Sequence, residues 1–246
     1  MYNLGNYRVW NPWKGCFPVS EACDDCFIKH KGTFIDCFYD YCFETCERGD
    51  VIAVCLQSDF FLREADRLRR MAWDRIRKNS HLIFLIITKR PERIRDCLPT
   101  DWGDGYDNVV LCTTSETQNR ADERLPIVAE IPCKHRWITC CPLLEEIDLT
   151  PYLKSKKFEL VEILGEKSYH KESRPCKHSW VLGIREQCVE NNVGLALLGV
   201  GSNYILDSEN TLHDRCKCFT SPVAHSLEVD HHVPISFNLD GSEFLI

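Results

Sequence analysis

The chain has 246 residues, of which 44% are hydrophobic, and it carries a formal net charge of −7. This length suffices for one large α/β domain or two small ones, and the composition excludes a disordered chain. The negative net charge argues against the binding of long nucleic acids through overall charge, but it does not exclude a local basic groove. The start is too mixed for a signal peptide, and the longest apolar run (81–87) is too short for a membrane span. We therefore expect a cytoplasmic protein without a membrane partner.

Apolar runs typical of strands alternate with segments of helical spacing along the chain. The predicted strands cover 50–56, 82–88, 108–114, 134–141, 158–164 and 193–200. The predicted helices cover 61–79, 90–98, 117–131 with a break at Pro126, and 179–192. This repeated order implies a parallel sheet with right-handed crossovers. Because six such units fall short of a closed eight-stranded barrel, we predict an α/β fold with a partial (βα)6 TIM-like barrel.

The predicted barrel occupies residues 1–200 and begins with an N-terminal loop rich in cysteine. Residues 201–246 show only short strand signals, and we expect them to form a C-terminal extension packed on the barrel. Sixteen cysteines occur in the whole chain. In a reducing cytoplasm they would be thiols or metal ligands rather than disulfides. Those within strand-like runs are expected to be small buried core residues. They include Cys55, Cys112 and Cys140.

Three cysteines precede the first predicted strand in the spacing C-x6-C-x2-C: Cys16, Cys23 and Cys26. Three thiolates are one ligand short of a closed tetrahedral zinc site. The fourth ligand would be Cys37, Cys42 or His30. Three thiolates also suit a [4Fe-4S] cluster with one iron open to a small molecule. The spacing alone leaves zinc, an iron–sulfur cluster and no metal as alternatives.

A second group of cysteines has the spacing C-x4-C-x3-C and comprises Cys37, Cys42 and Cys46. A second metal site at these cysteines is one interpretation. The favoured interpretation is that they are free thiols in a helical, partly exposed segment.

Several motifs occur in a specific joint order over residues 8–200. They are "WNPWKGC" with "VSEACDDC", "ITKRPERI", "NVVLCTTSETQNRADERLP", "CPLLEEIDL" and "RPCKHSWVLGIREQC". The three-cysteine loop before a partial barrel resembles the radical S-adenosylmethionine (SAM) superfamily, whose most typical motif is C-x3-C-x2-C. More specifically, the chain is similar to an uncharacterised bacterial and phage-associated family of radical-SAM-like proteins with a C-x6-C-x2-C motif.

The chain departs from that family at several places. Phe27 replaces the usual tyrosine after the third cysteine, and Cys141 replaces a glutamate before "PLL". The turn "LGEKSY" replaces Gly-Gly-Glu-Ser-Gly but keeps Gly165 and Glu166. The last strand ends in "LLGVGS" instead of a Lys-Gln pair. Several departures lie at strand ends, which implies a different substrate or a partly lost activity.

The resemblance implies that Cys16, Cys23 and Cys26 hold a [4Fe-4S] cluster whose open iron binds the amine and carboxylate of SAM. An electron from a donor such as flavodoxin or ferredoxin would cleave SAM to methionine and a 5'-deoxyadenosyl radical. The radical would abstract hydrogen from an unidentified substrate, with a nucleobase or nucleic acid and a peptide as candidates.

Ligands of parallel α/β folds bind at the carboxyl ends of the strands. Polar residues directly after the predicted strands are therefore the candidates for binding SAM. They are Ser58, Asp59, Lys89, Ser115, Glu116 and Glu166. Asp59 would accept a hydrogen bond from the SAM ammonium, and Lys89 would bind a carboxylate. For several of them helix capping is the structural alternative.

Two other function classes remain open. In the first, the protein is a zinc-stabilised binding module whose cysteine loop is an inert clip. In the second, it is a thiol redox protein using Cys23 and Cys26, which leaves Cys16 unexplained. Bound metal distinguishes the clip from the cluster, because an iron–sulfur protein is brown with labile sulfide and a zinc protein is colourless.

Overall fold

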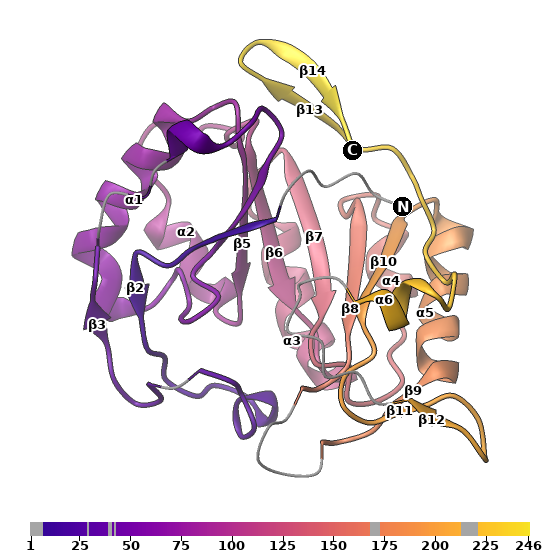
Figure 1. The fold of residues 1–246 in the computed structure, drawn as a ribbon. Coiled ribbons are helices and arrows are strands. Elements are labelled where there is room, and N and C mark those ends of the chain that lie inside the picture. The colour runs from indigo at the N-terminus through magenta and orange to yellow at the C-terminus, as the bar shows by residue number, and fades with distance from the viewer. Residues whose placement is uncertain (1–6, 29, 39–40, 42, 168–172, 213–220) are drawn as a thin grey trace.

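The computed structural model describes residues 7–28, 30–38, 41, 43–167, 173–212 and 221–246 (Figure 1). Within these residues, seven strands form one parallel sheet in the order β1-β4-β5-β6-β7-β8-β10. They are β1 (Arg8–Trp10), β4 (Val51–Val54), β5 (Ile83–Thr88), β6 (Val109–Thr114), β7 (His135–Cys140), β8 (Leu160–Leu164) and β10 (Gly194–Gly199). The predicted α/β class with a parallel sheet is confirmed. The edge strand β1 was not predicted, because three residues are too few to show a period.

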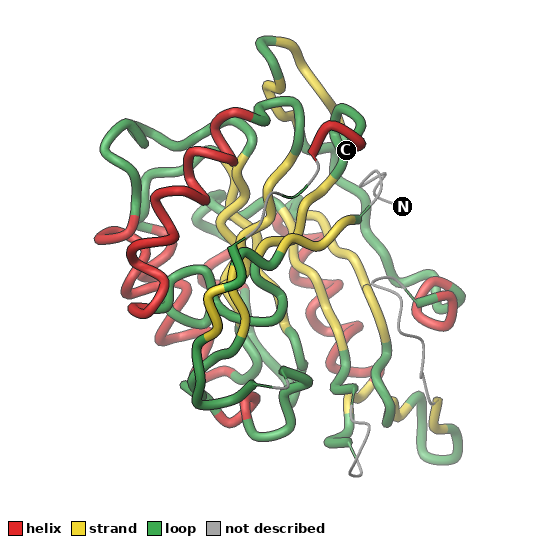
Figure 2. The backbone as a smooth tube through the Cα atoms, turned by 60° about the vertical axis from the view of Figure 1, so that its left-hand side comes forward, coloured by secondary structure: helices red, strands yellow, loops and turns green. Residues whose placement is uncertain are grey.

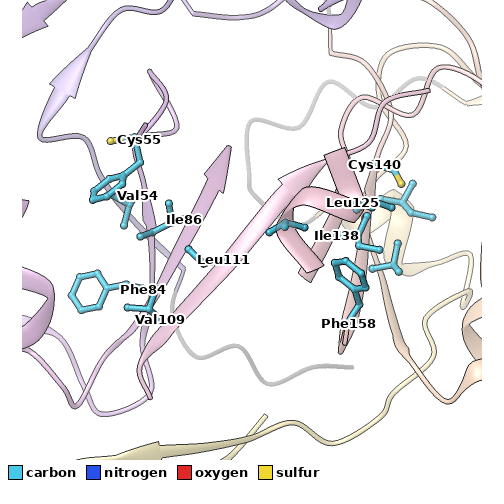
Figure 3. Packing of buried hydrophobic residues seen from close by; sticks show 14 of the residues in the cluster. Val54, Cys55, Phe84, Ile86, Val109, Leu111, Leu125, Ile138, Cys140 and Phe158 are labelled. Atoms are coloured by element: carbon cyan, nitrogen blue, oxygen red, sulfur yellow. The ribbon is translucent and has the colours of Figure 1, made fainter. Parts of the chain in front are cut away.

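The central strands are buried on both faces, which explains their nearly continuous apolar sequence. One face carries the larger apolar cluster, part of which is shown in Figure 3 with Phe84, Ile86 and Leu111 on neighbouring strands. The other face carries a smaller cluster that includes Leu85 and Trp137. The strand cysteines Cys55, Cys112 and Cys140 are buried as expected.

The sheet is curled into a half-barrel. Tyr7 directly precedes β1 at one edge, and Glu162 lies on β8 with four strands in between. The Tyr7 hydroxyl nevertheless donates a hydrogen bond to Glu162 Oε1 at 3.1 Å. Such a contact requires the two strands to face each other across the concave side, as strands do in barrels. Glu162 alternates with Val161 and Ile163 of the larger cluster, so it points to the concave side together with Leu160.

Helices cover the convex side of the sheet (Figures 1 and 2). They are α1 (Asp66–Lys78), α2 (Ile94–Cys97), α3 (Gln118–Ala129), α4 (Thr150–Leu153) and α5 (His178–Asn191). The predicted break at Pro126 is wrong, because α3 continues through it. Burial of Leu125 and Val128 against the sheet offsets the hydrogen bond that the proline removes. Of the helices that the structure describes, none is long and apolar enough to cross a membrane.

The remaining elements are short. They are β2 (Trp13–Lys14), β3 (Ile35–Asp36), β9 (Cys176–Lys177), β11 (Tyr204–Ile205), β12 (Thr211–Leu212), α6 (Pro222–His225), β13 (Ser236–Leu239) and β14 (Ser242–Leu245), with 3₁₀ turns η1 (Glu21–Cys23), η2 (Phe43–Thr45), η3 (Arg63–Ala65) and η4 (Pro91–Arg93). Ile235, Phe237 and Leu239 pack on the concave side of the sheet. The β13–β14 hairpin lies at the amino-terminal edge of the strands, and the N-terminal loop lies at the opposite edge (Figure 1).

Candidate functional site

The cysteine loop lies against the carboxyl ends of β5 and β6. The Ser20 hydroxyl donates to Glu116 Oε1 at 3.1 Å, directly beyond β6. Arg90, just after β5, donates from Nη2 to the Phe17 carbonyl at 2.6 Å and from Nη1 to Cys16 Sγ at 3.7 Å. The structure therefore brings the three-cysteine loop to the same edge as the polar residues that follow the strands.

Glu21 clamps this loop to the body of the protein. Its carboxylate accepts hydrogen bonds from the Thr117 hydroxyl at 3.0 Å and from Arg120 Nε and Nη2 at 3.1 and 2.9 Å. Arg174 donates to its backbone carbonyl at 3.0 Å. Burial raises the pKa of Glu21, but the Arg120 and Thr117 hydrogen bonds outweigh it and bring the pKa to about 2. The sequence does not single out Glu21 as a site residue, because a lone glutamate two residues before a cysteine forms no pattern of its own.

The environment of Cys23 favours its thiolate. Burial raises its pKa, but the Val19 N–H at 3.5 Å, the Ser20 hydroxyl at 3.7 Å and the charge of Lys89 lower it below the ordinary value. For Cys16, burial raises the pKa, and the nearby Arg90 guanidinium offsets only part of the rise. Cys16, Cys23 and Cys26 are all free thiols.

The loop does not present a finished metal site. Over the part of the chain that the structure describes, no three or more His, Cys, Asp or Glu side chains are grouped so that they could hold a metal ion. Of the fourth ligands considered, His30 is exposed and Cys37 contacts the Asn11 carbonyl at 3.8 Å. Cys42 lies outside the described residues.

Cys141, directly after β7, is a further thiol at this edge. Burial raises its pKa to about 11, with an opposing effect from the charge of Lys89 and a further rise from Cys26. Cys141 therefore lies within electrostatic reach of both residues. The sequence identified it only as a departure from a family glutamate.

Asp59 is saturated with hydrogen bonds. It is buried, and it accepts from the Phe61 N–H at 2.9 Å, the Thr88 hydroxyl at 2.9 Å and the Lys89 N–H at 3.0 Å. Arg90 Nη1 forms an ion pair with it at 3.0 Å. The predicted neighbour Ser58 donates to the Gly15 carbonyl at 2.5 Å. Both residues thus connect the end of β4 to the cysteine loop and to β5.

The other two predicted carboxylates are also paired. Glu116 is fully buried, pairs with Lys89 and accepts from Arg124 Nη1 at 2.7 Å. Glu166 accepts from the Arg174 backbone N–H at 2.9 Å and pairs with its guanidinium. Lys89 and Glu116 therefore belong to one network, and Glu166 belongs to a second network that reaches the loop through Arg174 and Glu21.

Ser115 differs from these residues. It is fully buried, and its hydroxyl has no hydrogen-bond partner among the residues that the structure describes. Buried polar groups are nearly always satisfied, so an unsatisfied hydroxyl at a strand end indicates a missing partner. Of the predicted site residues that the structure describes, Ser115 is the one whose side chain has no hydrogen-bond partner.

A cavity of about 140 Å³ lies where the loop meets the sheet edge. It is lined by Val19, Lys89, Pro91, Glu92, Glu123, Arg124 and Ile127. Binding sites for organic cofactors usually exceed about 300 Å³. The loop would have to move outward to admit a ligand of that size.

Fold and site together define an α/β protein with a curled parallel sheet and a cysteine loop at its carboxyl edge. A family model described as "Protein of unknown function (DUF5131)" matches residues 42–212. The match covers more than half of the chain, so the protein belongs to this family. The matched range contains the strands from β4 to β10 but not the cysteine loop. Neither a curated protein nor a solved structure matches the chain.

Proposed function

We propose that the protein is a radical SAM enzyme that uses a [4Fe-4S] cluster on the cysteine loop. The observation that carries the proposal is the meeting of three free thiols with polar strand-end residues at the carboxyl edge of a parallel sheet. With SAM bound and one electron from a reduced flavodoxin or ferredoxin, the cluster would supply methionine and a 5'-deoxyadenosyl radical that takes a hydrogen atom from the substrate.

The chemistry of the donor set fits such a cluster. Cluster ligands must be thiolates, and the hydrogen bonds and the Lys89 charge at Cys23 favour that form. Arg90 at 3.7 Å from Cys16 Sγ would stabilise negative charge on a second ligand. The unsatisfied Ser115 hydroxyl supports a polar ligand, such as a ribose, beside the loop. The three thiols would converge only after a rearrangement of residues 16–26.

The paired carboxylates suggest positioning roles in this proposal. Asp59 would hold Arg90 against the loop rather than contact SAM directly, since Arg90, Thr88 and two backbone N–H groups already occupy its oxygens. Glu116 would position Lys89, and the Lys89 ammonium would turn to the SAM carboxylate when the loop opens.

The finer form of the fold also belongs to the proposal. The strands β4, β5, β6, β7, β8 and β10 would be the six strands of a partial (βα)6 barrel, with β1 added at the edge. In such a barrel the reaction would take place at the carboxyl edge, with the substrate on the concave side. A nucleobase or nucleic acid and a peptide are the candidate substrates. Cytoplasmic location would keep the free thiols reduced.

The test is anaerobic iron and sulfide reconstitution followed by an assay for 5'-deoxyadenosine from SAM under reduction. We expect about four irons per chain and nucleoside formation, both lost in Cys16→Ala, Cys23→Ala and Cys26→Ala. Cys133→Ser, at the amino-terminal edge, is the matched control and should retain both. Iron incorporation and nucleoside formation that do not depend on the three loop cysteines would refute the proposal.

A zinc-stabilised binding module is the second candidate. The observation that favours it is that the carboxylates Asp59, Glu116 and Glu166 are already ion-paired, as expected for a structural edge. In this case the purified protein is colourless, binds one zinc per chain and yields no nucleoside.

A further inference from the structure

Glu162 is a buried carboxyl group that lacks an ionic partner. It lies in the middle of β8, its exposed fraction is 0%, and Oε1 accepts a hydrogen bond from the Tyr7 hydroxyl at 3.1 Å. Its Oε2 atom has no hydrogen-bond partner within the described part of the chain. No described Lys, Arg or His forms an ion pair with it, in contrast to Asp59, Glu116 and Glu166. A buried carboxyl in this state is costly unless something else pairs with it.

A second unsatisfied polar atom lies on the same concave side. Trp137 on β7 is fully buried, and its Nε1–H donor has no partner among the described residues. In the β7–β8 register Trp137 lies opposite Leu160, and Thr139 lies opposite Glu162. Trp137 and Glu162 are therefore diagonal neighbours on one face of adjacent strands. One offers a hydrogen-bond donor and the other an acceptor.

The position of Glu162 connects it to the edge that carries the cysteine loop. Glu162 is two residues from the end of β8, and it lies within electrostatic reach of Cys141 at the end of β7. Cys141 is partly exposed, whereas Glu162 is fully buried. Among the described residues, burial and the charge of Glu162 raise the pKa of Tyr7, Cys112 and Cys141, and none of these three groups is cationic.

We propose that Glu162 anchors a ligand site on the concave side of the half-barrel that binds an organic amine or guanidine. The ligand's cationic N–H group would pair with Glu162 Oε2, and an acceptor atom of the same ligand would receive the Trp137 Nε1–H. Burial raises the pKa of Glu162 to about 7, so ionising it for such a ligand costs little near neutral pH. The identification of this ligand as the substrate rests on the proposed function, whereas the ligand site itself does not.

The test follows the Glu162 carboxyl directly in wild-type protein whose glutamates carry ¹³C at Cδ. The probes are ethanolamine hydrochloride and methylguanidine hydrochloride, with tetramethylammonium chloride, which lacks N–H donors, as the control at equal ionic strength. The resonance is assigned by its loss in Glu162→Gln. We expect both N–H probes to move it, saturably, to the ionised position and to raise Tm, with no effect of tetramethylammonium.

Glu162→Gln should lose the rise in Tm, and Glu159→Gln, which changes the carboxyl paired with His135 just before β8, should keep it. A resonance unmoved by both probes, or moved equally by tetramethylammonium, overturns the proposal. So does an equal rise in Tm in Glu162→Gln. Because the titration needs neither cluster nor SAM, it can fail while deoxyadenosine is formed, and it can succeed where none is formed.

Discussion

The ion pair between Asp59 and Arg90 is the best-defined interaction at the scale of single residues. Both side chains are buried, with 4% and 10% exposed, and the Nη1–Oδ2 distance is 3.0 Å. Arg90 also reaches Cys16 Sγ and the Phe17 carbonyl. A single substitution at Asp59 therefore affects the cysteine loop as well as β5.

We predict that Asp59→Asn destabilises the protein by about 3 kcal/mol, because it leaves the buried Arg90 charge without its counter-ion. The measurement is the free energy of unfolding from urea titration. The matched control is Asp74→Asn, whose exposed partner Arg77 lies in the same helix, and it should cost no more than about 1 kcal/mol. Equal effects of the two substitutions would contradict the prediction.

At the scale of elements, the close approach of the ends of β8 and β10 shapes the site. A Cβ atom on Gly165 would overlap the Val200 carbonyl oxygen, whereas a Cβ atom on Gly183 in α5 would meet no atom within 4 Å. We expect Gly165→Ala to cost about 1–3 kcal/mol through overpacking. Gly183→Ala should increase the free energy of unfolding by about 0.5–1 kcal/mol, because alanine has a higher helix propensity than glycine. In thermal unfolding, a lower Tm for Gly165→Ala and a higher Tm for Gly183→Ala would confirm the close contact between the ends of β8 and β10. A higher Tm for Gly165→Ala would contradict it.

The Glu21 clamp joins the loop to α3. Because the folded-state pKa of Glu21 is depressed to about 2 from 4.5, the clamp is present above pH 4.5 and is lost as pH falls toward 2. Glu21→Gln should therefore be less stable than wild type at neutral pH by about 1 kcal/mol, since its carboxylate is 38% exposed and screened by water. In urea titrations over this range the difference should vanish in acid. A difference that persists unchanged in acid would show that charge is not its cause.

The sequence predicts the elements better than the contacts among them. The strands β4, β5, β6, β7, β8 and β10 and the helices α1 and α5 follow from apolar runs and helical spacing, which are local properties. Local patterns also place Asp59, Lys89, Ser115 and Glu116 at strand ends. They do not reveal that Asp59 and Glu116 are saturated by Arg90 and Arg124, because those pairings depend on tertiary packing.

At the scale of the whole molecule, the curl of the sheet creates an interior that the order of elements does not specify. Tyr7 and Glu162 are 155 residues apart, and they meet only because β1 and β8 face each other. The same curl buries Glu162 without an ion pair to any cationic side chain of the described residues. A position in a strand of otherwise apolar residues is thereby converted into a titratable group near neutral pH.

Because of Glu162, we predict that the free energy of unfolding falls as the pH rises. The folded-state pKa of Glu162 is raised by burial from 4.5 to about 7, so between these values the folded protein holds a proton that the unfolded chain has released. Its contribution is fully present below pH 4.5 and is lost as pH rises through 7, with a total change of about 3 kcal/mol. Glu21 acts with the opposite sign and only below pH 4.5.

Urea titrations of wild type and Glu162→Gln at about pH 4, 6 and 8 separate the two groups. The stability difference between the two proteins should shift by about 3 kcal/mol in favour of the glutamine variant over this range, because glutamine carries no titratable proton. Glu159→Gln is the control for a general effect of removing a carboxylate. Its free energy of unfolding should depend on pH in the same way as that of the wild type. A difference between wild type and Glu162→Gln that is independent of pH would mean that Glu162 has the same pKa in the folded and the unfolded protein, and therefore that another group offsets the effect of its burial.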